Sequence, residues 1–307
     1  GIPLELHEGT LQLYEVVDGE EKPVASQLDG DFDKTLRWIL AGETAPGTTR
    51  NFILRSIPGP SAGSSSSKVG IEDDGKSLTL NVAGKNILSY RYAVKNPPEG
   101  VSKIYARGGY IHPLWSPEGE VLTRSQPPDH YHHYGIWNPW TRTEFEGKEV
   151  DFWNLNKGEG TVRPESLPLK VSGSVYGGFE AVLNHVDLKA SAPSGEKVAL
   201  REKWEVKAWN ADPEQEVWLI DFASTLNPAS ESPLTIKEYR YQGFSIRATE
   251  KWSDETATLL TSEGKNKSNG NGTRARWTDI NGVSEAGHSG ILMMTHPGNY
   301  NFPEQLR

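Results

Sequence analysis

Cysteine is absent from the 307-residue sequence. This absence excludes disulfides, zinc–thiolate sites and thiol nucleophiles. Long apolar runs are also missing, because no segment approaches the roughly 18 consecutive apolar residues of a membrane-spanning helix. Mean hydropathy is −0.60, and we therefore expect a soluble protein with no membrane span.

Positive charge is scarce, since the net charge is −9 and the isoelectric point is about 5.5. Proteins that bind nucleic acid need clustered Lys and Arg to neutralise phosphates. The composition therefore excludes a nucleic-acid partner and favours a neutral or polar small-molecule ligand. The sequence opens on Gly1-Ile2-Pro3 rather than Met, which is typical of a processed or tagged end. From this start we expect a periplasmic or secreted bacterial protein.

Helical periodicity is missing as well, because no stretch of 12 or more residues repeats its apolar positions every 3.6 residues. The alternation from Val198 to Ala208 instead predicts a half-buried strand, which a polar turn joins to a second strand at 217–222. Residues 78–82 and 87–90 predict another hairpin. We predict an all-β fold, a large antiparallel β-sandwich with long ordered loops, of which a galactose-mutarotase-like supersandwich is one form.

Composition divides the chain into three parts. We predict a small N-terminal β segment at 1–58, a Gly/Pro/Ser-rich linker or loop at 59–68, and the main β-sandwich at 69–307. Proline and tryptophan are frequent between residues 94 and 166, which predicts an ordered set of loops over one end of the sandwich.

Histidine is concentrated in one segment. Three of the eight histidines fall within four residues, at His130, His132 and His133, and His112 lies a short distance before them. Neutral imidazole is both a proton-transfer group near physiological pH and a common metal ligand. If the protein has an active site, it is built around this segment.

The same region carries a resemblance to a known family. The runs 109–119, 127–137 and 150–153, and later 243–247, 275–279 and 295–299, resemble a soluble bacterial family of unknown function, DUF6807. Its members are often labelled "methane oxygenase PmoA". The resemblance covers roughly residues 78–303. The relatives continue beyond the position of Arg307, so we expect the main domain to be C-terminally incomplete.

The label conflicts with the sequence, because a particulate methane oxygenase is a membrane assembly and nothing here predicts a span. What the resemblance implies is a β-sandwich of the kind found in sugar-active proteins. The implied partner is a glycan or a sugar-derived small molecule.

Acid–base chemistry is one interpretation of the histidine segment, because sugar-ring opening or epimerisation can use a His with a carboxylate. Tryptophan faces can stack on sugar rings, and the planar forks of arginines can bind hydroxyls. The predicted catalytic residues are His132, His133, Asp129, Glu238 and His296. The predicted substrate-binding residues are His112, His130, Trp137, Trp153, Arg247, Arg276 and Asn299.

Metal binding is the alternative interpretation. On a strand His130 and His132 would share a face and His133 would point away, but a loop could bring all three around one divalent ion. Otherwise we expect no cofactor.

We predict a carbohydrate-active enzyme: a hydrolase, lyase or epimerase that acts on a glycan or sugar derivative through His–carboxylate chemistry. In this mechanism His132 or His133 acts as acid or base, and Asp129 or Glu238 assists. One alternative is a carbohydrate-binding protein without activity. The other is a metal-dependent oxygenase or isomerase that uses the histidines as ligands.

Overall fold

The computed structural model describes residues 10–29, 35–58, 68–212, 214, 216–285 and 287–307. Strands account for 51% of it and helices for 2%, and its sheets are antiparallel, which confirms the all-β sandwich predicted from alternation. The helices are two 3₁₀ turns, η1 (Lys103–Tyr105) and η2 (Leu155–Lys157). Within the described ranges no helix is long and apolar enough to cross a membrane.

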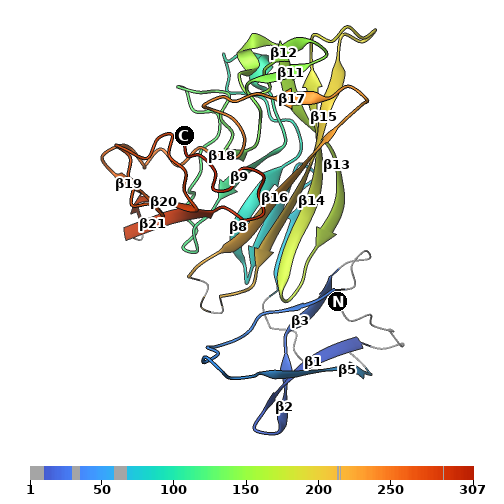
Figure 1. The fold of residues 1–307 in the computed structure, drawn as a ribbon, viewed down its shortest axis with the longest axis vertical. Coiled ribbons are helices and arrows are strands. Elements are labelled where there is room, and N and C mark those ends of the chain that lie inside the picture. Colours follow the sequence, from blue (N-terminus) through green and yellow to red (C-terminus); the bar gives the residue numbers. More distant parts are fainter. Residues whose placement is uncertain (1–9, 30–34, 59–67, 213, 215, 286) are drawn as a thin grey trace.

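Two sheets form the main body (Figure 1). The first has the strand order β18-β10-β9-β8-β7-β6, and the second has the order β13-β14-β15-β16. The bounds of the first sheet are β6 (Val69–Asp73), β7 (Ser77–Val82), β8 (Lys85–Arg91), β9 (Tyr110–Leu114), β10 (Ile136–Trp137) and β18 (Ser245–Ile246). Those of the second are β13 (Gly160–Val171), β14 (Tyr176–Asp187), β15 (Lys197–Trp209) and β16 (Leu219–Pro228).

The hydrophobic core lies between these sheets. The ring of Tyr90 in β8 lies 4.9 Å from that of Phe179 in β14 and 5.8 Å from that of Trp204 in β15. Leu78 and Leu80 of β7 are fully buried in the same cluster. Along β7, and along β15 from Glu202 onwards, buried residues alternate with less buried ones, as a half-buried antiparallel sheet requires.

A carboxylate is buried beside this core. Glu202 of β15 is 1% exposed, and its Oε1 accepts hydrogen bonds from Asn138 (2.6 Å), Ser224 (2.6 Å) and Trp204 (2.5 Å). Its Oε2 lies 2.8 Å from Nε2 of the fully buried His185 in β14. Burial alone would raise the pKa of Glu202, but the hydrogen bonds from these partners outweigh it and lower the pKa.

The N-terminal strands form a separate small layer below the main body in Figure 1. β1 (Thr10–Val17) pairs with β2 (Glu20–Val24) and β5 (Asn51–Ile57), while β3 (Ser26–Asp29) pairs with β4 (Thr35–Trp38). Gln27 links this layer to the main body, because its Oε1 accepts hydrogen bonds from the backbone N–H groups of Val175 and Tyr176. Of the predicted linker, 59–67 lies outside the described residues.

Two small sheets complete the fold. β11 (Thr143–Phe145) pairs with β12 (Lys148–Val150) and with β17 (Leu234–Ile236). β19 (Ala257–Thr261), β20 (Trp277–Ser284) and β21 (Gly287–Met294) form a three-stranded sheet at one side of the main body (Figure 1).

The prediction of an ordered set of loops at 94–166 is wrong in part, because the short strands β9 to β12 lie within this region. Strand β13 also begins before its end, at Gly160, and includes Pro164. Proline cannot donate to a ladder, so it is tolerated on an edge strand, and β13 is the edge of its sheet. The pairing with β14 shifts register directly after Pro164. Both predicted hairpins are confirmed, as β7–β8 and β15–β16.

The buried carboxylate generates a stability prediction. Glu202→Gln replaces an acceptor of four hydrogen bonds by an amide that can accept only at one atom, and we expect a loss of roughly 3 kcal/mol in unfolding free energy near pH 7. The pKa of Glu202 is lower in the folded state, so its contribution is present above the unfolded value of 4.5 and is lost as the pH falls through the folded value. The difference between wild type and variant should therefore shrink in acid.

Urea denaturation followed by fluorescence at several pH values measures this difference. Glu205→Gln is the matched control on the same strand, because Glu205 is 35% exposed and pairs with Lys203 near the surface. We expect the control to cost less than about 1 kcal/mol. Equal losses for the two variants would contradict the role assigned to Glu202.

Candidate functional site

The three clustered histidines lie on consecutive tight turns between β9 and β10. The N–H of His130 donates to the carbonyl of Pro127 (2.9 Å), and the N–H of His133 donates to that of His130 (3.0 Å). Gly135 then adopts a φ of +63°, and a Cβ there would lie 2.3 Å from the carbonyl oxygen of Ile111. Only glycine allows the chain to leave these turns and pack directly against β9.

The turns bring the three imidazoles together. The rings of His130 and His133 stack with centroids 4.6 Å apart and an interplanar angle of 18°. The ring of His132 meets that of His133 edge-on at 4.6 Å and lies 5.6 Å from that of His130. The side chain of His130 is 45% exposed, whereas His132 and His133 are partly buried.

Two tryptophans cover the inner side of His133. The ring of Trp137 lies 5.0 Å from that of His133, and the ring of Trp153 lies 5.8 Å away, perpendicular to it. Trp137 is 2% exposed and Trp153 is 8% exposed. We predicted both as platforms for a sugar ring, but in this structure their faces are covered, and they instead bury His133.

Asp129 lies at the centre of the charged groups. Its Oδ2 is 2.8 Å from Nδ1 of His130 and also accepts a hydrogen bond from the guanidinium of Arg247. A second guanidinium, that of Arg124, lies 3.9 Å from Oδ1. The hydrogen bond with His130 and then that with Arg247 hold the pKa of Asp129 well below its usual range. Asp129 therefore remains a carboxylate.

Backbone pairing explains why two arginines reach one aspartate. The N–H of Arg124 donates to the carbonyl of Arg247 (2.9 Å), and that of Arg247 donates to Gly135 (2.6 Å). Gly135 in turn donates to Arg124 (2.9 Å). These three residues thus lie side by side although more than 100 positions separate Arg247 from the others.

The surroundings of His133 and His132 lower the pKa of both imidazoles. Burial, and then the neighbouring rings of His132 and His130, lower the pKa of His133 to about 3. Its Nδ1 faces Nη1 of Arg247 at 3.5 Å, so Nδ1 is the acceptor and Nε2 carries the hydrogen. Burial also lowers the pKa of His132. Near neutral pH both are uncharged imidazoles.

His112 of β9 lies next to this cluster rather than in it. Its Nδ1 is 3.0 Å from Oγ1 of Thr123, which also accepts a hydrogen bond from the N–H of Leu114. Burial, and secondly the charge of Lys95, lower the pKa of His112 to about 4. The side chain lines a cavity that Arg124 also lines.

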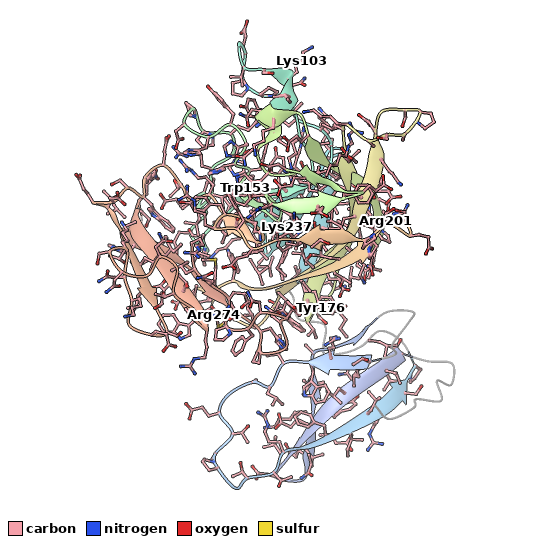
Figure 2. All side chains as sticks on the ribbon, turned by 45° about the horizontal axis from the view of Figure 1, so that its top comes forward. Lys103, Trp153, Tyr176, Arg201, Lys237 and Arg274 are labelled. Atoms are coloured by element: carbon pink, nitrogen blue, oxygen red, sulfur yellow. The ribbon has the colours of Figure 1, made fainter. Side chains whose placement is uncertain are left out.

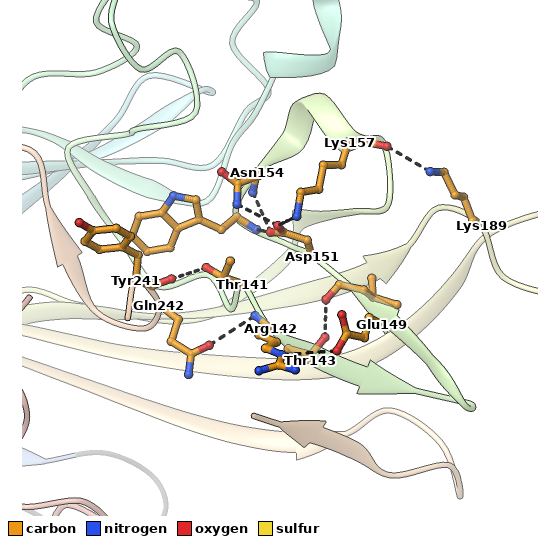
Figure 3. Close-up of polar contacts among 12 residues, drawn as sticks. Thr141, Arg142, Thr143, Glu149, Asp151, Asn154, Lys157, Lys189, Tyr241 and Gln242 are labelled. Atoms are coloured by element: carbon orange, nitrogen blue, oxygen red, sulfur yellow. Dashed lines mark hydrogen bonds and ion pairs between the residues drawn. The ribbon is translucent and has the colours of Figure 1, made fainter. Parts of the chain in front are cut away.

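A second carboxylate of the loop region supports Trp153. Asp151 is 2% exposed, and its Oδ1 accepts hydrogen bonds from the backbone N–H groups of Trp153 and Asn154, both at 2.8 Å. Its Oδ2 accepts hydrogen bonds from the Asn154 amide and from Nζ of Lys157 (2.7 Å). Figure 3 shows Asn154 and Lys157 converging on Asp151. Its acceptor capacity is used by the loop itself, so Asp151 positions Trp153.

Arg107 packs against Tyr134, the residue that follows His133, and was not predicted from the sequence. It is 2% exposed, and its guanidinium carbon lies 5.1 Å from the ring centroid of Tyr134. The hydroxyl of Tyr134 donates to the carbonyl of Tyr105 (2.7 Å). Arg124 was missed as well, because its contact with Asp129 depends on the backbone pairing and not on sequence spacing.

Four predicted residues share no hydrogen bond, ion pair or ring contact with the histidine cluster in the part of the chain that the structure describes. Glu238 is exposed in the loop after β17, and His296 is exposed after β21, with its Nδ1 accepting from the N–H of Gly298. The others belong to the C-terminal sheet region: Arg276 pairs with Glu263, and Asn299 donates to Glu304. Arg274, two residues before Arg276, lies well away from Trp153 in Figure 2.

The cluster does not fit a three-histidine metal site in this arrangement. Ligating nitrogens must lie about 2.0–2.1 Å from one ion, with each ring plane directed at it. The rings of His130 and His133 face each other instead. Among the described residues, no group of three or more His, Asp or Glu side chains is placed to hold a metal ion.

Comparison with known proteins identifies the family. Residues 77–307 match a family of unknown function, DUF6807. The match covers most of the chain, so this protein belongs to that family, as the motifs of the histidine segment suggested. No curated protein and no solved structure matches the chain. The methane oxygenase label receives no support from these comparisons.

The burial of His133 generates a prediction about its ionisation. Removing the indole in Trp153→Ala exposes the ring to water, and because burial is the largest cause of the lowered pKa, the pKa should rise from about 3 towards 6.5. NMR titration of the imidazole resonances measures it. In the wild type His133 should stay neutral from pH 8 to pH 5.

His112 provides an internal control in the same spectra, because among the described residues its ring makes no ring contact with Trp153, and its pKa of about 4 follows from burial and from the charge of Lys95. A wild-type His133 that titrates near 6.5 would contradict the burial argument. So would a His133 whose titration is unchanged in Trp153→Ala.

Proposed function

We propose that this protein is a carbohydrate-active enzyme that transfers protons at the oxygen atoms of a sugar, and so opens or epimerises its ring. The observation that carries the proposal is the Asp129–His130 pair, joined at 2.8 Å and stacked on a neutral histidine. Such chemistry needs one base and one hydrogen-bond donor near the same oxygen.

His130 is the base in this proposal. Asp129 accepts the hydrogen of Nδ1, which leaves the lone pair of Nε2 available. Within the described residues Nε2 makes no hydrogen bond, and the side chain is 45% exposed. When Nε2 takes the proton of the anomeric hydroxyl, C1 and that oxygen form a carbonyl and the bond from C1 to the ring oxygen breaks. The adjacent carboxylate stabilises the imidazolium, which then returns the proton to the ring oxygen.

His133 is a hydrogen-bond donor in this proposal rather than the base predicted from the sequence. A pKa of about 3 makes its imidazole a weak base. With Arg247 at Nδ1, its Nε2–H can polarise an oxygen atom while the ring stays neutral. His132 is also neutral and lies 4.6 Å from His133, ring to ring.

Hydrolysis by a pair of carboxylates has less support. That mechanism needs one carboxyl group that is protonated and a second that is ionised, both free to face the substrate. Asp129 is held as a carboxylate by hydrogen bonds with His130 and Arg247. The oxygens of Asp151 accept four hydrogen bonds from its own loop and are therefore not free to face a substrate. Of the activities considered from the sequence, epimerisation or ring opening therefore agrees best with this geometry.

Substitutions in the pair test the proposal. His130→Gln removes the base, and Asp129→Asn removes the charge that stabilises the imidazolium. We expect each to lower turnover by roughly a hundredfold to ten-thousandfold, with much smaller changes in sugar binding. The assay follows anomer equilibration of reducing sugars by NMR, and cleavage of glycosides by chromatography.

His288→Gln is the matched control, because His288 is an exposed histidine on β21 whose side chain has no hydrogen bond, ion pair or ring contact with the cluster among the described residues. It should retain full turnover. Undiminished turnover in His130→Gln would overturn the base assignment. Cleavage of glycosides without any isomerisation would overturn the reaction type, and binding without turnover in the wild type would favour a carbohydrate-binding protein.

A further inference from the structure

A cavity of about 570 Å³ lies beside the histidine cluster. Its walls come from the segment that follows β9, from residues 249–251, and from Glu285 in the turn between β20 and β21. This volume falls within the range of about 300–1000 Å³ that is typical of small-molecule sites. Ion pairs fix the walls, because Lys251 bridges Glu120 (2.7 Å) and Glu285 (3.0 Å).

Arg124 joins the cavity to the proposed catalytic pair. Its guanidinium lines the cavity and lies 3.9 Å from Asp129 and 3.8 Å from Glu250. Both distances exceed those of direct hydrogen bonds, which are about 2.7–3.2 Å. Within the described residues neither Nη1 nor Nη2 of Arg124 makes a direct hydrogen bond, and the side chain is 28% exposed, so both groups can donate to a ligand oxygen.

His112 supplies a second polar group on the wall of the cavity. Thr123 occupies its Nδ1, while Nε2 makes no hydrogen bond within the described residues. Because its pKa is about 4, the ring is neutral near pH 7 and can interact with an uncharged hydroxyl without bringing a net charge.

The charges around the cavity restrict the ligand. Four carboxylates line it, from Glu118, Glu120, Glu250 and Glu285, against the two cations Arg124 and Lys251. An anionic ligand would be repelled by this excess, and a cationic one would meet Arg124 at the wall nearest to Asp129. Hydroxyl groups avoid both kinds of repulsion because they are uncharged. Each hydroxyl can also accept a hydrogen bond from Arg124 and donate one to a glutamate.

We propose that this cavity binds a neutral, hydroxyl-rich sugar ring, next to the ring on which His130 acts. The inference rests on the proposed function and makes its substrate more specific: a neutral disaccharide or longer glycan that spans both positions. Arg124 is then a residue that determines specificity, since it contacts the ring in the cavity.

Binding of matched monosaccharides tests this subsite without any need for turnover. The probes are the neutral sugars glucose, galactose, mannose and xylose, with glucuronate, galacturonate, glucosamine and galactosamine as charged counterparts. Saturation-transfer NMR and calorimetry detect binding. We expect at least one neutral sugar to bind with a dissociation constant in the roughly millimolar range, and more tightly than its charged counterparts.

Two substitutions locate that binding in the cavity. Arg124→Met keeps a side chain of similar length without donors, and should weaken binding of the neutral sugar at least tenfold. Glu250→Lys reverses one charge at the exposed rim, where Glu250 is 78% exposed, and should move the preference towards the uronate. Arg142→Met is the control, because Arg142 is an exposed arginine that pairs with Glu149, and it should bind as the wild type does.

His130→Gln separates this inference from the proposed function. The variant should bind the neutral monosaccharide as well as the wild type does, because His130 does not line the cavity. Binding that persists in Arg124→Met, a uronate that binds more tightly than its neutral counterpart, or no neutral sugar bound at roughly 100 mM would each overturn the subsite. Turnover that survives His130→Gln, with cavity binding as expected, would overturn only the proposed reaction.

Discussion

The buried carboxylate of Glu202 is the constraint on which the placement of the site depends. A carboxylate removed from water must have all its acceptor sites satisfied, or the fold is severely destabilised. Its donors come from β14, β15 and β16, and from Asn138 in the loop region. Asn138 is thereby fixed to the interior of the sandwich. The neighbouring Trp137 packs on His133, so the hydrogen bond between Asn138 and Glu202 in the core also sets the position of the turns that carry the histidines.

Most of the main sandwich could be predicted because its signal is local. Alternation along β15 places Trp204 and Val206 on the inner face, and the neighbouring turn fixes its pairing with β16. The prediction failed at β13, where Pro164 was read as a loop residue. A proline is tolerated there because β13 is an edge strand. The order of strands in a sheet depends on long-range contacts and cannot be predicted from local composition.

The candidate site was predictable only in part, for the same reason. The concentration of histidines identified the segment, and the neighbouring Asp129 and His130 do form a pair. Arg247 was predicted as a substrate-binding residue from its guanidinium beside apolar strand residues, but its partner Asp129 could not be known, because the two residues are 118 positions apart. Arg107, Arg124 and Glu202 carried no local signal. Residues close in the sequence also differ in burial, since two indoles cover His133 while the side chain of His130 faces solvent.

The cavity lies close to the Asp129–His130 pair, but its charged residue Arg124 has little electrostatic effect on that pair. Asp129 owes its lowered pKa first to His130 and then to Arg247, and Arg124 is not among the causes. At 3.9 Å and partly exposed, the Arg124–Asp129 pair contributes little. A ligand oxygen that takes a hydrogen bond from Arg124 would therefore leave the basicity of the pair almost unchanged. Under the proposed function, the cavity would contribute by holding the substrate in the correct orientation, and orientation alone supplies a large part of many catalytic accelerations.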